Sequence, residues 1–307
     1  AKHWRFTHNF MHHKYTNILG MDDDVGYGVI RVTRDQKWKP FNLYGNLLFN
    51  TLLAIGFEWG VGLQHLEIGK IFKGRDNRQA TLKRLREFGA KAGSQVFKDY
   101  VAYPAVTSLS PGATYRSTLT ANAVANVIRN VWANAVIFCG HFPDGADKFT
   151  KTDMVGESKG QWYLRQMLGS ANFEAGPALR FMSGNLCHQI EHHLYPDLPS
   201  NRLYEISIRV QQLCDKYDLP YTTGSFPVQY GKTWRTIAKL SLPDRFLRDT
   251  ADDAPETRSE RMFAELGPGY AGTEAGVDPS TGRKRGLKTA VAAVRTWRRE
   301  RREARAA

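Results

Sequence analysis

The sequence has little cysteine: 307 residues contain Cys139, Cys187 and Cys214, and none of them forms a Cys-x-x-Cys pair. An odd number of isolated cysteines argues against a disulfide framework and favours free thiols in a reducing compartment. No nicotinamide or flavin fingerprint is present either, so a redox activity would need electrons from another protein. No Glu-x-x-His pair occurs, which argues against the carboxylate-rich metal centre of ferritin-like bundles.

Long apolar runs are also missing. No window reaches the about 20 consecutive apolar residues of an ordinary membrane helix, because Asn, Glu or Arg interrupts segments 43–66 and 119–140. Polar side chains inside a membrane are costly unless they face protein or a cavity. We expect residues 95–140 to form a helical hairpin turned at Pro111-Gly112 in a membrane. Core helices of a soluble protein are the alternative.

Positive charge is concentrated in two places. Residues 283–307 hold ten Lys and Arg and two Glu, and so contribute +8 to the net charge of +13. Residues 70–98 hold nine Lys and Arg. If 43–66 crossed the membrane, segment 70–98 would lie outside, against the positive-inside rule, so we expect 43–66 to be interfacial or cytosolic. The tail is interpreted as solvated or as binding anionic groups. Nucleic acid is not expected as a partner, because no nucleic-acid-binding motif accompanies the charge.

Histidines are the main functional signal. The chain repeats one pattern, a histidine, three residues and a histidine pair, at 8–13 and at 188–193. Neutral imidazole is the commonest metal ligand in proteins, so the repeat predicts a metal site. On an α-helix, at ~100° per residue, His8 and His12 would share a face, while His13 would point ~100° away from His12. The pattern therefore favours two neighbouring ions over one zinc.

The remaining segments are predicted to be mainly helical. Residues 1–20 and 161–193 are expected to be helices that carry the two clusters, and 200–217 shows an amphipathic helical repeat. The run Asp22-Asp23-Asp24 could bind a cation, but a solvated loop is the commoner explanation. From about residue 244 onward the composition predicts a poorly ordered tail.

The clusters and their neighbours resemble those of the membrane fatty acid desaturases. The matching segments are HWRFTHNFMHHKYTN at 3–17, Gly140-His141, Ala171-Asn172-Phe173 and HQIEHHLYP at 188–196. The stretch NILGMDDDVGYG at 17–28 is further similar to actinobacterial acyl-CoA desaturases of the stearoyl-CoA delta-9 type. The resemblance spans roughly residues 1–240.

The resemblance implies an all-α integral membrane fold with a helical hairpin in the membrane and a cytosolic, histidine-rich metal-binding cap. The family's first histidine box has no match and would precede Ala1, so we interpret the chain as an N-terminally truncated fragment. The expected parts are a cytosolic segment with the second box (1–42), interfacial or cytosolic helices (43–98), the membrane hairpin (99–140), the cap with the third box (141–243) and a basic tail (244–307).

The resemblance also implies the ligands of a di-iron centre: His8, His12, His13, His141, His192 and His193. The third box allows two registers, because either His188 or Gln189 could take its first position. A straight helix would align His188 with His192 at i and i+4, so we expect His188 to be the ligand. Glu191 is expected to accept an imidazole N–H behind the ligands, and Gln189, Asn172 and Asp144 are further candidates for such supporting roles.

The implied activity is O₂-dependent desaturation of a saturated long-chain acyl-CoA, with a cis double bond at delta-9. Breaking two unactivated C–H bonds needs a redox metal and O₂, because no acid–base side chain can do it. Electrons are expected from NADPH through a separate reductase or ferredoxin-like carrier, and segment 70–98 could dock that carrier or the phosphates of coenzyme A. The enzyme is expected in the cell membrane as a multi-pass protein, in contact with lipid, with its active site facing the cytoplasm.

Two other interpretations remain open. An acyl-lipid desaturase or a fatty acid hydroxylase would use the same centre on another substrate or with another product. A protein of a different class, a basic zinc-binding interaction protein without catalysis, would also carry histidine clusters.

Overall fold

The computed structural model describes residues 7–64, 66, 78–143, 145–217, 219–247, 295 and 298–304. In these residues the fold is all-helical, as predicted, and the only β-type pairings are two isolated bridges, Ile18 with Phe149 and Glu174 with Ser225. The chain divides into two compact units. The first combines Ala1–Asn50 with Val136–Ala307, and the second is Thr51–Ala135.

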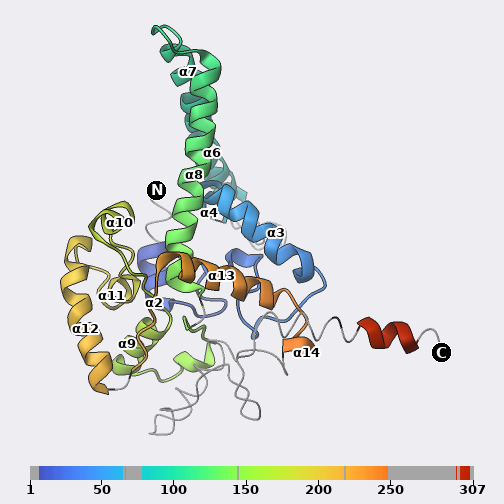
Figure 1. The fold of residues 1–307 in the computed structure, drawn as a ribbon, viewed down its shortest axis with the longest axis vertical. Helices are drawn as coiled ribbons and strands as arrows, with labels where there is room; N and C mark the ends of the chain where they lie inside the picture. The colour runs from blue at the N-terminus through green and yellow to red at the C-terminus, as the bar shows by residue number, and fades with distance from the viewer. Residues whose placement is uncertain are drawn as a thin grey trace. The chain divides into compact units, whose positions relative to one another are not determined.

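The first unit carries both histidine clusters on short helices (Figure 1). Its elements are η1 (Thr7–His12), α2 (His13–Tyr15), η2 (Gly26–Gly28), the start of α3 (Asn42–Ile55), the end of α8 (Tyr115–His141), η4 (Thr152–Met154), α9 (Lys159–Leu168), α10 (Pro177–Met182), α11 (Gln189–Leu194), η5 (Ser200–Arg202), α12 (Leu203–Tyr217), α13 (Phe226–Leu240) and α14 (Asp244–Leu247).

Two of the predicted helices differ from the structure. The N-terminal cluster lies on a π-helical turn, η1, which continues into α2 and ends at Tyr15; residues 1–6 lie outside the described residues. The predicted helix 161–193 is three helices, because a loop with Pro177 at its end separates α9 from α10. Gly184 and Asn185, both at φ +62°, then turn the chain between α10 and α11.

The amphipathic helix predicted over 200–217 is confirmed as η5 and α12. Its inward face carries Leu203, Val210 and Cys214, which recur at the helical period. Part of this face joins a buried core with Ile18 and Ile190, so α12 packs behind both histidine clusters. Most of the predicted tail, 244–307, lies outside the described residues.

The buried side chain of Arg165 links α9 to the end of α2. The fully buried Arg165 side chain forms an ion pair with Glu157 at 2.6 Å. Its other nitrogens donate to the backbone carbonyls of Lys14 and Thr16 at 3.3 and 3.4 Å. Since these carbonyls closely follow His13, Arg165 fixes the position of the second histidine box.

The second unit is a helical hairpin (Figure 1). It contains α4 (Phe57–Gln64), α6 (Arg78–Phe97), η3 (Lys98–Ala102), α7 (Tyr103–Thr107) and most of α8. The chain reverses between α7 and α8 at Pro111-Gly112, as predicted, and Gly112 adopts φ +84°, which glycine reaches without strain. Among the described residues, α8 is long and apolar enough to cross a membrane, and α3 with α4, bent by 108°, meets the same criterion as a pair.

The polar residues of this hairpin face one another. Asn122 Nδ2 donates to the Asp99 carbonyl at 2.6 Å, and Asn126 Nδ2 contacts the Asp99 carboxylate at 3.3 Å and the Tyr100 hydroxyl at 2.9 Å. Arg129 forms an ion pair with Glu58 of α4. Polar groups that satisfy each other in this way lower the cost of placing a helix in lipid.

Replacing Arg165 tests how much its buried ion pair with Glu157 stabilises the fold. In Arg165→Ala, Glu157 loses its partner, and the free energy of unfolding should fall by about 3–5 kcal/mol. Chemical denaturation of the detergent-solubilised protein measures this. The exposed pair Arg202–Glu205 provides the control: Arg202→Ala should cost less than about 1 kcal/mol. Equal losses of unfolding free energy in the two variants would contradict a stabilising role for the Arg165–Glu157 ion pair.

Candidate metal centre

Six histidines from three separate parts of the chain converge in the first unit. They form two groups whose ligand atoms lie within 4.8 Å of one another: His8 with His13 and His192, and His12 with His141 and His193. The groups are neighbours, because the rings of His13 and His193 are 4.6 Å apart, centroid to centroid. The second group is buried, whereas His8 and His192 are half-buried.

Each histidine pair divides between the two groups. His12 and His13 belong to different groups, and so do His192 and His193, as the helical spacing predicted. The helical spacing placed His8 and His12 on one face, and their rings are stacked 5.2 Å apart, but the His8 ring is also 4.9 Å from that of His13 and groups with His13 and His192. The reason is the π-helical η1, which has more residues per turn than the α-helix assumed from the sequence.

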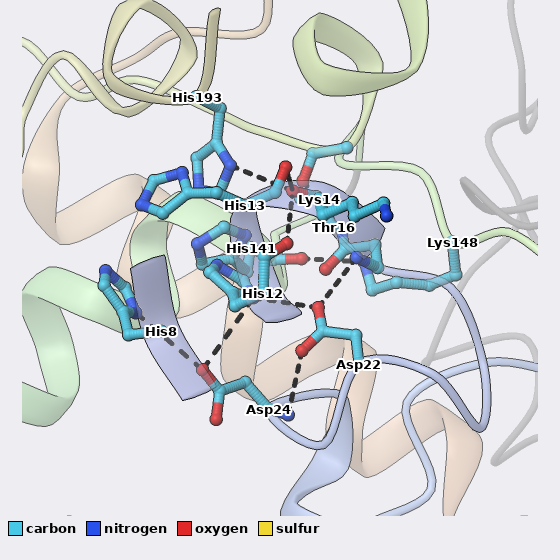
Figure 2. Close-up of polar contacts among 12 residues, drawn as sticks. His8, His12, His13, Lys14, Thr16, Asp22, Asp24, His141, Lys148 and His193 are labelled. Atoms are coloured by element: carbon cyan, nitrogen blue, oxygen red, sulfur yellow. Dashed lines mark hydrogen bonds and ion pairs between the residues drawn. The ribbon is translucent and has the colours of Figure 1, made fainter. Parts of the chain in front are cut away.

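Outer hydrogen bonds orient the rings of the buried group (Figure 2). His12 Nδ1 lies 2.8 Å from Asp22 Oδ2, and His193 Nδ1 lies 3.1 Å from the Thr16 hydroxyl oxygen. The Thr16 hydroxyl lies within hydrogen-bond distance of Gln166 Oε1 at 2.7 Å and of the His12 carbonyl at 2.8 Å. With Nδ1 of both rings engaged in this way, the Nε2 lone pairs are available to a cation.

Gln189 is next to the same ligand atoms. Its amide nitrogen lies 3.0 Å from His141 Nε2 and 3.3 Å from His193 Nε2, while its Oε1 is buried without a partner. The nitrogen and oxygen of an amide are assigned from the surrounding hydrogen bonds, and the reverse orientation would place Oε1 beside both imidazoles. Gly140 allows this approach, because a Cβ there would lie 2.7 Å from Gln189 Cγ.

Burial keeps most of the cluster neutral. Burial and the neighbouring His192, His12 and His8 lower the pKa of His13 to about 2. The pKa of His192 falls to about 4 for the same kind of reason, and that of His193 lies well below its ordinary value. Neutral imidazole is the form that binds metals.

His12 is the exception. Burial alone would lower its pKa, but the charge and hydrogen bond of Asp22, with the charge of Asp24, outweigh burial and raise the pKa to about 9. The carboxylates of Asp22 and Asp24 therefore stabilise positive charge on the His12 ring.

His188 lies outside both groups. Helix α11 begins at Gln189, and His188 precedes it with φ −104° and ψ 57°, so the straight-helix alignment with His192 assumed from the sequence does not exist. The His188 ring lies 5.8 Å from that of Tyr204 instead. Of the two candidates for the first position of the third box, Gln189 is the one that lies beside the histidines of the buried group.

Glu191 is buried, and no histidine among the described residues donates an N–H to it, in contrast to the expectation from the sequence. It accepts hydrogen bonds from Asn172 Nδ2 and the Tyr221 hydroxyl, both at 2.9 Å. Burial raises its pKa, an effect that these hydrogen bonds oppose. Asn172 also accepts from the Ile190 amide at 2.9 Å, so this network holds α11 in place. Asp144 lies outside the described residues.

Sequence reasoning missed several supporting residues. The run Asp22–Asp24 was not linked to the histidines, although its closeness to the first cluster was a usable signal. The sequence carries no such signal for Lys148. Its buried side chain donates to the carbonyl of His141, the last residue of α8, at 2.7 Å and to that of Ala146 at 2.6 Å. Gln166, from α9, donates to the His13 carbonyl at 2.9 Å.

The donor set fits a pair of metal ions. The atoms His13 Nδ1, His141 Nδ1 and Gln189 Oε1 are buried without a hydrogen-bond partner, which is costly unless another group satisfies them. Imidazole suits iron, zinc and copper, so the ligands by themselves do not select the metal. Fold and site together define a helical, histidine-rich protein with a candidate dinuclear centre.

Comparison with known proteins gives the family. The family model described as fatty acid desaturase matches residues 1–225. An NADPH-dependent stearoyl-CoA 9-desaturase of Mycobacterium tuberculosis is 80% identical over 304 residues, which cover 99% of this chain and 70% of the relative. An sn-1 linoleoyl-lipid 6-desaturase of Synechocystis is 24% identical over 71% of this chain and 60% of its own length. No solved structure matches the chain significantly.

The chain therefore belongs to the fatty acid desaturase family and is an enzyme of that class. Members of the family are associated with membranes, in agreement with the candidate membrane helix α8.

The close contact between α8 and Gln189 gives a direct test of the site. In Gly140→Ala, the new methyl group must displace Gln189, and with it α11 and the third box. We expect metal affinity to fall by about 10–100-fold, in the range seen when groups around metal ligands are lost. Metal analysis of purified protein after chelator competition measures this.

Gly231, inside α13, is the matched control, because a Cβ there meets nothing within 4 Å. Gly231→Ala should leave metal affinity unchanged and raise stability by up to about 1 kcal/mol. Normal metal affinity in Gly140→Ala would show that Gln189 and α11 can move without effect on the centre.

Proposed function

We propose that the protein is a membrane-bound, O₂-dependent acyl-CoA desaturase that introduces a cis delta-9 double bond into a saturated long-chain acyl group. One observation carries the proposal: two groups of three histidines, from boxes far apart in the sequence, converge in a chain 80% identical to a stearoyl-CoA 9-desaturase. The same centre on a lipid-bound chain, or with a hydroxylated product, remains the alternative within the class.

The proposed ligands are His8, His12, His13, His141, His192 and His193, with Gln189 beside the buried group. A pair of iron ions held there would supply the O₂ chemistry that breaks unactivated C–H bonds. The chain's own contribution is to hold neutral rings in fixed orientations. Asp22 and Thr16 accept the outer N–H of two rings, and the packing of α9, α11 and α12 keeps their segments together.

Electrons are proposed to come from NADPH through a separate reductase or carrier. The Mycobacterium tuberculosis relative is named as NADPH-dependent, and this chain contains no nucleotide-binding fingerprint of its own. Helix α6 exposes Lys83, Arg86 and Lys91, whose charge suits either an acidic carrier or the phosphates of coenzyme A.

The proposed topology is that of a multi-pass membrane protein with a cytoplasmic active site. The hairpin of 99–140 exposes apolar side chains along both arms, among them Val106, Leu109 and Ile128. Exposed apolar surface on helices of this kind suits lipid. The basic residues of α6 precede the hairpin, as expected for the cytoplasmic side. The cap, 141–243, would then face the cytoplasm, with 43–98 at the interface.

Product analysis tests the reaction. The complete natural protein, expressed in a strain without its own desaturase and supplied with labelled stearoyl-CoA, should yield a labelled delta-9 monounsaturated product. His192→Ala should abolish the product while the protein still accumulates in membranes, and Arg202→Ala, at an exposed position, should not. Mass spectrometry of the extracted lipids gives the result. A hydroxylated product, or conversion only of phospholipid-bound chains, would overturn the proposal.

Metal analysis separates the enzyme from a non-catalytic zinc protein. Protein purified in detergent under reducing, anaerobic conditions should contain about two irons per chain, since two groups of ligands are present. Removal of the iron with a chelator should abolish turnover, and ferrous iron should restore it. A single tightly bound zinc would exclude the di-iron proposal.

A further inference from the structure

The loop Asp22–Asp24 contacts histidines of both metal groups (Figure 2). Asp22 is buried, and its Oδ2 lies 2.8 Å from His12 Nδ1. The same oxygen accepts the Asn17 amide at 2.8 Å, while Oδ1 accepts the Asp24 amide at 3.0 Å. Three hydrogen bonds thus hold the Asp22 carboxylate in one orientation.

Asp24 lies near the rings of both His8 and His12. Its Oδ2 is 3.9 Å from His8 Nδ1 and 3.8 Å from His12 Nδ1, and its side chain is 26% exposed. His8 belongs to the group with His13 and His192, whereas His12 belongs to the buried group. One short loop therefore supplies a carboxylate next to a histidine of each group.

The same atoms could be interpreted as a third cation site, formed by His8, His12 and Asp24. The geometry disfavours this. His12 Nδ1 is already engaged by Asp22 at 2.8 Å, and a ring nitrogen that donates its proton has no lone pair for a metal. For His12, the atom left for a cation is Nε2.

We propose that Asp22 and Asp24 are positioning residues of the metal centre: Asp22 fixes the ring and tautomer of His12, and Asp24 places negative charge between His8 and His12. This rests on the proposed metal centre. An imidazole that ligates a metal carries no charge, so two divalent ions would bring positive charge that none of the six histidines balances. Carboxylates directly behind the rings, the buried Asp22 and the partly exposed Asp24, offset part of that charge and raise the basicity of the imidazoles.

The test measures metal affinity in the complete, detergent-purified protein, loaded with ferrous iron or with cobalt(II) and titrated against a chelator. Asp22→Ala should lower the affinity by about 10–100-fold. Asp22→Asn should lose less, because the amide oxygen can still accept the His12 N–H. Asp24→Asn should also weaken binding, with the full number of ions still bound at saturation.

Asp23, exposed in the same loop, provides the matched control: Asp23→Asn should bind metal like the wild type. A purely structural role would lower the unfolding temperature of the metal-free protein and leave the affinity of the folded fraction unchanged, and it would overturn the proposal. Loss of one ion at saturation in Asp24→Asn would also overturn it, since Asp24 would then be a ligand.

The ligand-field spectrum of the cobalt-loaded protein provides a second readout. It should shift in Asp22→Ala, recover partly in Asp22→Asn and stay unchanged in Asp23→Asn. Neither readout depends on turnover. A protein that binds two ions with this dependence on Asp22, but forms no desaturated product, would contradict the proposed function and leave the positioning role intact.

Discussion

The central constraint on this structure is the crowding of buried, neutral imidazoles. Burial makes protonation of these rings unfavourable, and charge on neighbouring rings adds to the cost, so the pKa of His13 falls to about 2. Such a cluster is stable only if its lone pairs are satisfied, and hydrogen bonds from the protein satisfy only part of them. The supporting residues around it can be understood as the means of holding these rings together for metal ions.

Polar contacts join the three segments that carry the histidines, in addition to the apolar core behind them. Arg165 and Gln166 of α9 bind the carbonyls at the end of the second box, and Lys148 binds the His141 carbonyl. Behind α11, Asn172 links the Ile190 amide to Glu191. Directional bonds of this kind specify ring positions more narrowly than hydrophobic contact does, and a metal centre needs that accuracy.

Polar contacts also join the helices of the second unit. Asp99 contacts Asn122 and Asn126 across the hairpin, and Arg129 pairs with Glu58, so polar groups of different helices satisfy one another, as helices in lipid would require. These residues explain why hydropathy alone gave only a borderline signal for segment 119–140. The polar positions that weaken the apolar pattern are those that join the helices.

Much of the metal centre was predictable from the sequence, because metal ligation demands particular side chains at particular spacings. The repeated pattern at 8–13 and 188–193, with the resemblance of the Gly140-His141 segment, identified the six histidines that converge, and the hairpin turn at Pro111-Gly112 followed from residue chemistry. The amphipathic repeat of α12 likewise depends only on local periodicity.

The tertiary structure decided which histidines share a group and what holds them. In the π-helical η1, His8 lies close to His13 as well as to His12, and the start of α11 at Gln189 leaves His188 outside both groups. The contacts of Thr16 with Gln166 and His193 join segments 150 and 177 residues apart in the sequence. Sequence spacing sets the angle between neighbours on one helix, but only packing of the whole chain determines which side chains from different helices meet.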